Sequence, residues 1–262
     1  MEIINLQEEY KTTYFTCLED YSEDMKRASN LKENWYNEMK GKGLRVKLAR
    51  HESGVIAGMV QYFPIEYSWI SGKDLYFIGC IWVHGHKQGH GNFQKQGMGT
   101  ALLKAAEEDV KSLGGKGLVA WGIPLPVWMK ASWFKKQGYK SVDKKGFLGE
   151  VLLWKPFTDD AVPPKWIKQK KKPQQEEGKV KITCISNGWC PAMNLANIRV
   201  REVAEEFGDN VVVEEINTLD RDTFDEWGVS DILYIDGQKV NTGPPPTKEK
   251  LRKQIAKKVS RL

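Results

Sequence analysis

The chain has 262 residues, of which 40 are basic and 34 acidic, so its formal net charge is +6. No apolar run reaches the ~18 residues that favour a membrane-spanning helix, the N-terminus lacks the basic-then-apolar order of a signal peptide, and four cysteines do not build a disulfide framework in a chain of this length. These features predict a cytoplasmic protein without a membrane partner, and the mild basic surplus suits an anionic small ligand better than nucleic acid, which needs a denser basic face.

The first predicted elements are strands. Residues 44–49 and 55–62 are typical of two strands joined by the turn His51-Glu52-Ser53-Gly54. Residues 75–83 form an apolar run that predicts a buried strand. These strands give the first half of the chain the frame of a sheet.

A loop with two glycines follows the third strand and opens a helix. The loop is residues 94–100, the predicted helix covers 97–113, and Gly114-Gly115 ends it as C-cap glycines do. Glycine lets the backbone pass close to phosphate oxygens, and the first amides of a helix have no partner within the helix. The sequence therefore predicts a main-chain anion site at this helix start.

Two well-known phosphate loops do not fit this segment. A nucleoside-triphosphate loop needs Lys-Ser/Thr directly after its last glycine, where Thr100 stands, and the dinucleotide fingerprint needs a third glycine at Leu102. The pattern that remains is Gln/Arg-x-x-Gly-x-Gly/Ala, carried by Gln94, Gly97 and Gly99. It resembles the pyrophosphate loop of the GNAT N-acetyltransferase family, which uses acetyl-CoA as a co-substrate.

The order of the following elements is similar to that family as well. Residues 117–123 predict a strand, 127–136 a short amphipathic helix, and 147–154 a last strand, with Gly138-Tyr139 at the start of the strand between them. The resemblance covers residues 1–156 and implies an α/β domain with a mixed sheet, in which strands four and five splay apart around pantetheine.

The resemblance also implies which residues bind the co-substrate. Main-chain amides at the end of the 75–83 strand would hold the thioester and pantetheine, and the loop would hold the pyrophosphate. Trp128, Trp133 and Phe134 would form an apolar wall along the CoA arm. No metal is expected. The implied CoA-binding residues are Ile81, Trp82, Val83, Gln94, Lys95, Gln96, Gly97, Met98, Gly99, Thr100 and Phe134.

The groups that would move protons are less clear from the sequence. Phe134 stands where many family members have the tyrosine that protonates the thiolate, and Trp128 stands where an asparagine is common. His84 directly follows the strand, and histidine exchanges protons near neutral pH, so it is the candidate base. Three interpretations of the segment 84–91 stay open: a solvated insertion, a substrate-facing flap with His84 as base, and a metal site, which the lack of a cysteine or carboxylate in the segment disfavours.

Residues 157–178 are rich in lysine, glutamine and proline and predict a linker. Beyond it, residues 179–262 predict a strand at 179–185, a helix from Pro191, strands at 211–216 and 232–235 with a short partner, and a helix from Lys248. A β-α-β unit followed by a hairpin and a helix resembles the thioredoxin fold.

Trp189-Cys190-Pro191 lies where a thioredoxin carries its first active cysteine. A thiol at a helix start has its thiolate favoured by the helix dipole, so Cys190 is a candidate monothiol. Met193 replaces the second cysteine, and Ser230-Asp231 stands where such folds carry a cis-proline. Together with Gly243-Pro244-Pro245-Pro246, these features resemble the YoaP-like domain that follows a GNAT domain in other proteins.

The sequence as a whole predicts an N-acetyltransferase that moves an acetyl group from acetyl-CoA to a primary amine by direct transfer in a ternary complex. A small molecule, a peptide N-terminus and a lysine side chain stay open as the acceptor, and the oligomeric state is not predicted. Two alternatives belong to other classes: an acyl-CoA-binding sensor with little turnover, and a monothiol redox module that works through Cys190.

Overall fold

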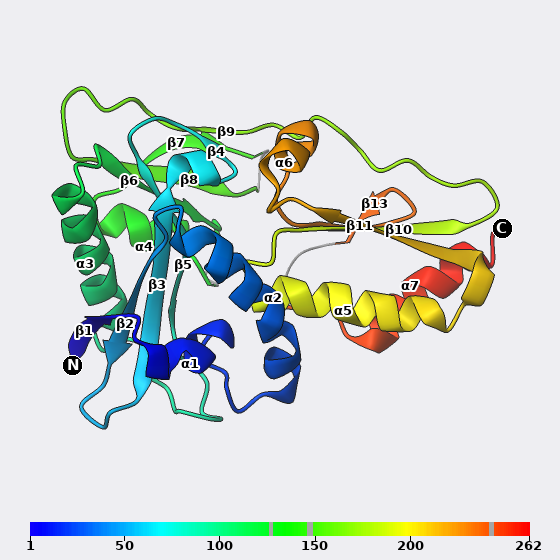
Figure 1. Ribbon diagram of the computed structural model, residues 1–262, viewed down its shortest axis with the longest axis horizontal. Coiled ribbons are helices and arrows are strands. Elements are labelled where there is room, and N and C mark those ends of the chain that lie inside the picture. Colours follow the sequence, from blue (N-terminus) through cyan, green and yellow to red (C-terminus); the bar gives the residue numbers. More distant parts are fainter. Residues whose placement is uncertain (126–127, 146–148, 241–243) are drawn as a thin grey trace. The chain divides into compact units, whose positions relative to one another are not determined.

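The computed structural model describes residues 1–125, 128–145, 149–240 and 244–262. The chain divides into two compact units (Figure 1). Unit 1 comprises Met1–Tyr21 and Asn37–Ile167, and unit 2 comprises Ser22–Tyr36 and Lys168–Leu262. The predicted domain limits at residues 156 and 178 stay predictions.

Unit 1 is built on a seven-stranded mixed sheet in the order β1-β2-β3-β5-β6-β8-β7. Neighbouring strands run antiparallel except β5 and β6, which are parallel. That parallel pair is short, because its register covers only Tyr76↔Leu118 and Phe77↔Val119 while both strands continue further. The strands are β1 (Glu2–Asn5), β2 (Arg45–Arg50), β3 (Ile56–Pro64), β5 (Tyr76–Val83), β6 (Gly117–Gly122), β7 (Lys140–Lys144) and β8 (Val151–Pro156).

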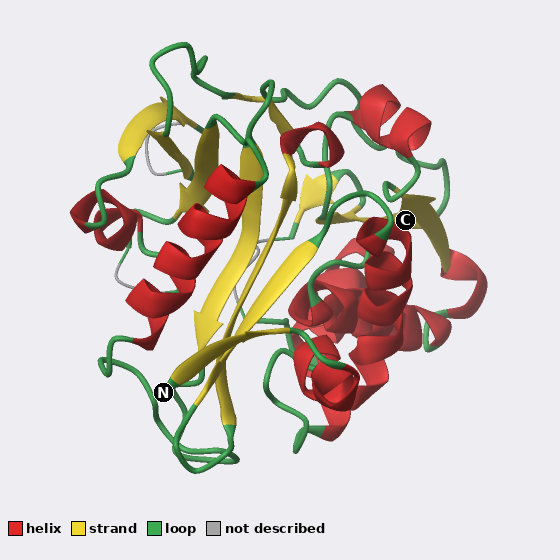
Figure 2. Cartoon of the chain, turned by 60° about the vertical axis from the view of Figure 1, so that its left-hand side comes forward, coloured by secondary structure: helices red, strands yellow, loops and turns green. Residues whose placement is uncertain are grey.

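Helices lie against this sheet (Figure 2). On one face is α3 (Met98–Ser112), because Leu102 of α3 is adjacent to Gly58 of β3, and Tyr62 of the same strand donates a 2.6 Å hydrogen bond to Asp109 of α3. On the other face is α1 (Lys11–Phe15), whose Tyr14 donates to Gln61, since successive strand residues point to opposite faces. The remaining short elements of unit 1 are η1 (Glu8–Tyr10), η2 (Ile65–Tyr67) and α4 (Ala131–Lys136).

A carboxylate fixes α3 to the edge of the sheet. Asp109 accepts two hydrogen bonds from Arg45 at 2.9 Å and pairs with Lys47 at 3.3 Å. Burial raises the pKa of this carboxyl, but the bonds from Arg45 and Tyr62 and the charge of Lys47 outweigh it and bring the pKa down to about 2. The helix whose start carries the predicted anion site is therefore held by charge as well as by packing.

The first part of the predicted linker is packed. Lys165–Trp166 forms strand β9 and pairs antiparallel with β4 (Ile70–Ser71). Trp166 is buried, and its main-chain amide donates to Asp143 at 3.0 Å. The polar composition of residues 157–178 did not indicate this contact, because the contact depends on one aromatic side chain among lysines.

Unit 2 contains a four-stranded sheet in the order β11-β10-β12-β13, in which β10 and β11 are parallel and the other pairs antiparallel. Its core is made by Val180, Ile182, Val200, Leu233 and residues of the last helix. The elements are β10 (Val180–Ser186), α5 (Pro191–Glu205), η3 (Gly208–Asn210), β11 (Val211–Asn217), α6 (Arg221–Trp227), β12 (Ile232–Ile235), β13 (Gln238–Lys239) and α7 (Lys248–Val259).

Unit 2 also includes the first part of α2 (Glu23–Lys40), which sequence periodicity did not single out. Arg199 of α5 bonds Asp24 at 2.6 Å, and Arg27 pairs with Glu202. These ion pairs join segments that are 175 residues apart, so no local pattern could have indicated them.

The predicted strands and long helices are confirmed, with ends that differ by at most four residues. The helix expected at 127–136 begins only at Ala131, because Met129 has a positive φ of 52° and Lys130 pairs with Ile123 in an isolated bridge. Its first residue Val127, the start of the 147–154 strand, and Gly243 of the proline motif lie outside the described residues. Within the described ranges, no helix combines the length and the apolar character that crossing a membrane requires.

Candidate functional site

The start of α3 is an open helix N-terminus. Gly97 is its N-cap residue, with φ at 82° in the left-handed region, and no side chain caps the helix. The first intrahelical bond closes from Ala101 to the carbonyl of Gly97. The amides of Met98, Gly99 and Thr100 therefore form the unsatisfied first turn, which together with the helix dipole favours an anion.

The loop before the helix is tied to the end of β5. The side-chain amide of Gln94 donates to the carbonyl of Val83 at 3.4 Å, and the main-chain amide of Gln94 donates to Asn92 at 3.0 Å. A Cβ on Gly85 would lie 2.1 Å from Nε2 of Gln94, so only glycine allows this approach. The strand end and the loop are thus brought together as the sequence predicts.

The predicted CoA-binding residues differ in exposure. Gln94, Lys95, Gln96 and Gly97 are exposed, Gly99 and Thr100 are half-buried, and Met98 points into the core. On β5, Ile81 is buried, whereas Trp82 and Val83 are half-buried. The role of each in binding CoA stays a prediction.

Phe134 lies away from the surface. It is 0 % exposed and packs against Trp133 and Tyr139, with ring centroids 4.9 and 5.5 Å apart. Trp133, its half-buried neighbour, is the aromatic residue at the loop, because a Cβ on Gly99 would lie 3.5 Å from its ring. Trp133 is thus better placed than Phe134 to line the entrance to the α3 start.

The segment of β5 before the loop is irregular. The register of β5 with β3 shifts between Gln61 and Tyr62, opposite Gly79. The indole of Trp121 on β6 donates to the carbonyl of Gly79 at 3.0 Å, where the two strands no longer pair through their backbones. A side chain therefore bridges the strands beyond their last paired residues.

His84 is fully buried, directly after β5. Its Nδ1 lies 2.6 Å from the carbonyl of Gly91, and its Nε2 lies 3.0 Å from the hydroxyl of Tyr21. The carbonyl only accepts hydrogen bonds, so Nδ1 carries the proton and Nε2 accepts from Tyr21. Sequence reasoning missed Tyr21, which precedes α2 and has no local feature that would mark it.

The segment 84–91 contacts the rest of unit 1 through its histidines, while residues 86–89 are exposed. His90 contacts Asp20 at 2.7 Å, and Asp20 also accepts a 2.8 Å bond from Thr13. His86 lies 3.8 Å from Glu19. In the part of the chain that the structure describes, no group of three or more His, Cys, Asp or Glu side chains is arranged to hold a metal ion.

Cys190 lies in unit 2 as the N-cap residue of α5, half-buried, with Pro191 in the first turn. Beside it, the indole of Trp189 donates to Asp231 at 2.7 Å. Burial raises the pKa of Asp231 to about 6, although hydrogen bonds from Ser230, Trp189 and Asn187 lower it. The start of α5 is therefore bordered by an enclosed carboxylate.

Cys184 differs from Cys190. It lies within β10, and burial raises the pKa of its thiol to about 12. A thiol with so high a pKa is not ionised near neutral pH, so Cys184 is a packing residue, as expected.

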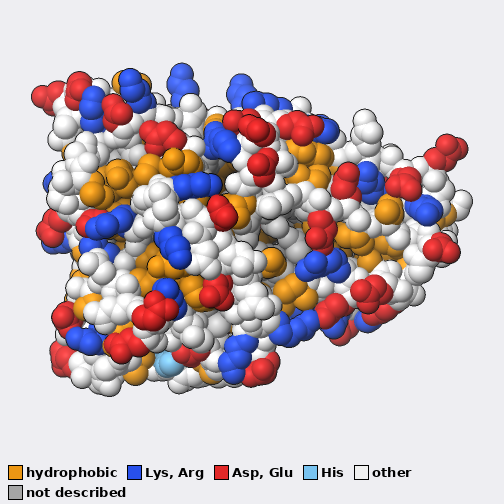
Figure 3. Space-filling model, in the orientation of Figure 1, with side chains coloured by type: hydrophobic (Ala, Val, Ile, Leu, Met, Phe, Trp, Pro, Cys, Tyr) orange, Lys and Arg blue, Asp and Glu red, His pale blue; other side chains and the backbone are white. Residues whose placement is uncertain are grey.

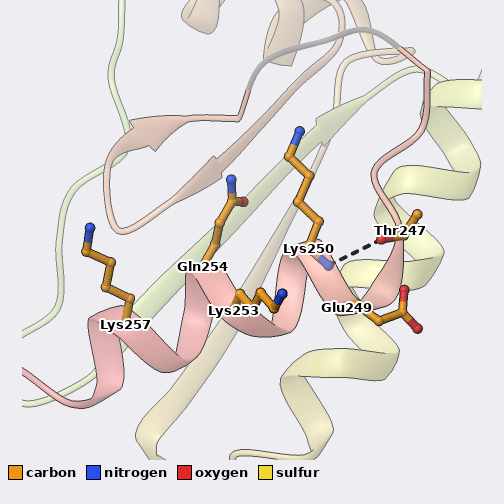
Figure 4. A pocket seen from close by; sticks show the side chains of 6 residues that line it. All are labelled: Thr247, Glu249, Lys250, Lys253, Gln254 and Lys257. Carbon is orange, nitrogen blue, oxygen red and sulfur yellow. Dashed lines mark hydrogen bonds between the residues drawn. The ribbon is translucent and has the colours of Figure 1, made fainter.

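Two surface grooves lie apart from these sites. One, of about 450 Å³, runs along α7 and is lined mainly by the long side chains of Lys250, Lys253 and Lys257 (Figure 4). The other, of about 560 Å³, lies between α4 and β7. Neither is lined by a predicted site residue. On the face shown in Figure 3, basic and acidic side chains are interspersed rather than gathered by sign.

Comparison with known proteins identifies the first part of the chain. Residues 3–125 match the model of the acetyltransferase (GNAT) family. No curated protein matches the chain. Residues 3–125 are thus similar to GNAT acetyltransferases, and this match supports an acyltransferase that uses acetyl-CoA as its acetyl donor.

Solved structures align with about three fifths of the chain. The GNAT N-acetyltransferase YhbS from Escherichia coli, in complex with CoA, is 13 % identical, with 61 % of this chain and 82 % of that chain covered and a TM-score of 0.44. The PaiA N-acetyltransferase from Thermoplasma acidophilum, in complex with coenzyme A, is 17 % identical, with 60 % of this chain and 98 % of that chain covered and a TM-score of 0.43. A GNAT acetyltransferase from Brucella melitensis, in complex with acetyl-CoA, is 16 % identical, with 62 % of this chain and 90 % of that chain covered and a TM-score of 0.40.

Proposed function

We propose that the chain transfers the acetyl group of acetyl-CoA directly to a primary amine in a ternary complex. The observation that carries this proposal is the start of α3, where three successive main-chain amides point out of an uncapped helix beside the end of β5. The GNAT match over residues 3–125 places this helix start within an acetyltransferase domain.

The residues present fit a pyrophosphate. Gly97 adopts a left-handed conformation with no atom within 4 Å of the position that a Cβ would take, so the backbone is open there. Lys95 and Gln96 are exposed on the same loop and add a positive charge and a donor. The amides of Met98, Gly99 and Thr100 would hold the pyrophosphate oxygens.

The strand end would hold the thioester. The backbones of β5 and β6 pair only at Tyr76 and Phe77, so the later residues of β5 keep main-chain groups that are not used between these two strands. Such groups at Ile81, Trp82 and Val83 support the role of donors to pantetheine and to the carbonyl oxygen that becomes negative during transfer. This arrangement also supports the expected gap between the strands.

The reaction needs two proton movements. The neutral amine attacks the thioester carbonyl, a C–N bond forms, the C–S bond breaks, and the amine loses a proton while the departing thiolate gains one. Phe134 has no hydroxyl and is buried, so it cannot donate that proton. His84 stays the proposed base, and its position after β5 places it beside the strand end that would hold the thioester.

The test combines binding and turnover. Calorimetry with CoA measures the binding step, and thiol release from acetyl-CoA is followed with three acceptors: a diamine, a peptide with a free N-terminus, and an N-blocked peptide with one lysine. Release that depends on one amine class supports the proposal and names the acceptor. Tight CoA binding with no release on any of the three would favour a sensor.

A second candidate function belongs to unit 2, which we propose has a thioredoxin-like, YoaP-like fold. The position of Cys190 at the start of α5 supports a monothiol that attacks disulfides. Mixed-disulfide formation with oxidised glutathione, measured by mass, is expected for the wild type and lost in Cys190→Ser. If Cys184→Ser abolishes it instead, Cys190 is not the reactive thiol.

A further inference from the structure

We propose that Tyr21 is the group that touches the acceptor amine, and that His84 receives the amine's proton through the hydroxyl of Tyr21. This inference rests on the proposed acetyl transfer and replaces direct contact between His84 and the amine by a two-residue relay. It assigns a catalytic role to Tyr21 and a positioning and proton-holding role to His84.

The burial of the two residues indicates which of them contacts the amine and which lies behind it. His84 is 0 % exposed, so no acceptor reaches its ring in this conformation, whereas Tyr21 is half-buried and keeps solvent-accessible surface. The hydroxyl of Tyr21 occupies the one nitrogen of His84 that can accept a proton, at 3.0 Å. A proton that enters His84 at Nε2 therefore has to come from Tyr21.

The hydrogen-bond directions define the path of the proton. The Nδ1–H of His84 donates to the carbonyl of Gly91 at 2.6 Å, so Nε2 has a lone pair directed at the Tyr21 O–H. When the amine nitrogen forms its bond to the acetyl carbon, its proton moves to the oxygen of Tyr21. The proton of Tyr21 moves at the same time to Nε2, so Tyr21 ends neutral and His84 ends as imidazolium.

The groups around the pair suit this charge. Burial, and then the negative charges of Glu19 and Asp20, raise the pKa of Tyr21, which keeps it a hydroxyl donor at neutral pH. These two carboxylates also pair with neighbouring histidines, Glu19 with His86 at 3.8 Å and Asp20 with His90 at 2.7 Å. The titratable and charged groups that face the pair are Glu19, Asp20, His86 and His90.

The geometry is fixed from both sides. A Cβ on Gly89 would lie 2.0 Å from the ring of Tyr21, so the segment 84–91 packs directly on that ring. The pair of hydrogen bonds on Asp20, from Thr13 and His90, anchors the residue next to Tyr21. The proton donor Tyr21 and the proton acceptor His84 are therefore in place before the amine binds, which preorganises the proton transfer.

The experiment uses the full chain, acetyl-CoA and the amine that gives the fastest thiol release. Tyr21→Phe removes only the hydroxyl, and His84→Gln removes the ring. The matched controls in unit 1 are Tyr67→Phe, at an exposed position, and His51→Gln, at a half-buried position of the β2–β3 turn. We expect both relay variants to lower kcat about 100-fold with the KM for acetyl-CoA unchanged. The double variant should lose no more than either single variant, because the two residues act as one unit.

The dependence of kcat on pH gives a readout that a structural role would not move. The relay predicts that the wild-type kcat falls on acidification and that Tyr21→Phe loses this fall. If Tyr21→Phe keeps wild-type kcat, or if the two losses multiply in the double variant, the relay is overturned and the proposed acetyl transfer stands.

If the wild type releases no thiol with any amine, the proposed function fails and the relay fails with it. His84→Gln removes a buried ring and can lose its fold, which its thermal melt would show. In that case Tyr21→Phe, whose shape is nearly unchanged, decides the matter through its kcat and pH profile.

Discussion

Two helices of this chain each follow a strand and a loop, yet the two helix starts differ in what they can bind. The first turn of α3 has Gly97 as N-cap residue and three main-chain amides without an intrahelical partner. The first turn of α5 has Cys190 as N-cap residue and Pro191, which has no amide hydrogen. A helix dipole is common to both, so the difference lies in which donors are left open.

The surroundings increase that difference. The loop before α3 is exposed, whereas the loop before α5 is filled by its own hydrogen bonds, from Trp189 to Asp231 and from Asn187 to Ser230. An anion is therefore stabilised at the start of α3, whereas at the start of α5 it lies near the carboxylate of Asp231. The comparison indicates that a helix N-terminus becomes an anion site only when the loop before it leaves the amides open.

The largest expected effect comes from the carboxylate beside α5. Because the folded-state pKa of Asp231 is about 6, above its usual 3.8, the contribution of this carboxyl to folding stability is greatest below about pH 4 and falls as pH rises through about 6, by about 3 kcal/mol. Asp231→Asn, which never ionises, should remove this fall. Urea unfolding of wild type and variant at acidic and neutral pH measures it, with the exposed Asp222→Asn as control; equal pH slopes in wild type and Asp231→Asn would contradict the burial of this charge.

The next effect concerns the start of α3. Gly97→Val places a β-branched residue at φ 82°, which costs about 1–2 kcal/mol and disturbs the amides that bind the anion. We expect CoA to bind about tenfold more weakly by calorimetry. Gly54→Val, at φ 85° in the β2–β3 turn with open space around it, carries the same strain and should leave binding unchanged. An equal loss of CoA affinity in both variants would mean that backbone strain in general, and not a change in this loop, weakens CoA binding.

A smaller effect is expected from Gln94→Ala. The Gln94 side chain makes one long bond of 3.4 Å to Val83, and the α3 amides do not depend on it. CoA affinity should fall about threefold, in line with the loss of one modest hydrogen bond. A loss of more than about thirtyfold would show that the side chain itself binds the ligand.

The smallest effect is expected at α5. Pro191→Ala restores an amide hydrogen to its first turn and should lower the free energy of unfolding by about 0.4–1 kcal/mol, chiefly through the unfolded chain. Calorimetry should still find one CoA per chain. A second bound CoA would show that the missing amide alone, and not the filled loop, closes this helix start.

The sequence by itself determined the main strands, the helices α3, α5 and α7, and the α3 start, because these depend on residues close together in the chain. Glycines at 97 and 99 and the apolar run before them predict an open helix start without knowledge of any distant residue. The turn at 51–54 and the strands that flank it follow from the same local logic. Phe134 shows the limit of local sequence reasoning. The sequence shows that this position has no hydroxyl, but it does not show that the side chain is completely buried.

Only the tertiary structure decided which side chains meet. Tyr21 and His84 are 63 residues apart, and Asp24 and Arg199 are 175 apart. Their contacts arise from how helices and loops close on the sheets. Main-chain donors are present at every residue and need only the right local conformation, whereas a pair of side chains needs the whole fold to bring it within 3 Å. For this reason the open helix start could be predicted and the partner of His84 could not.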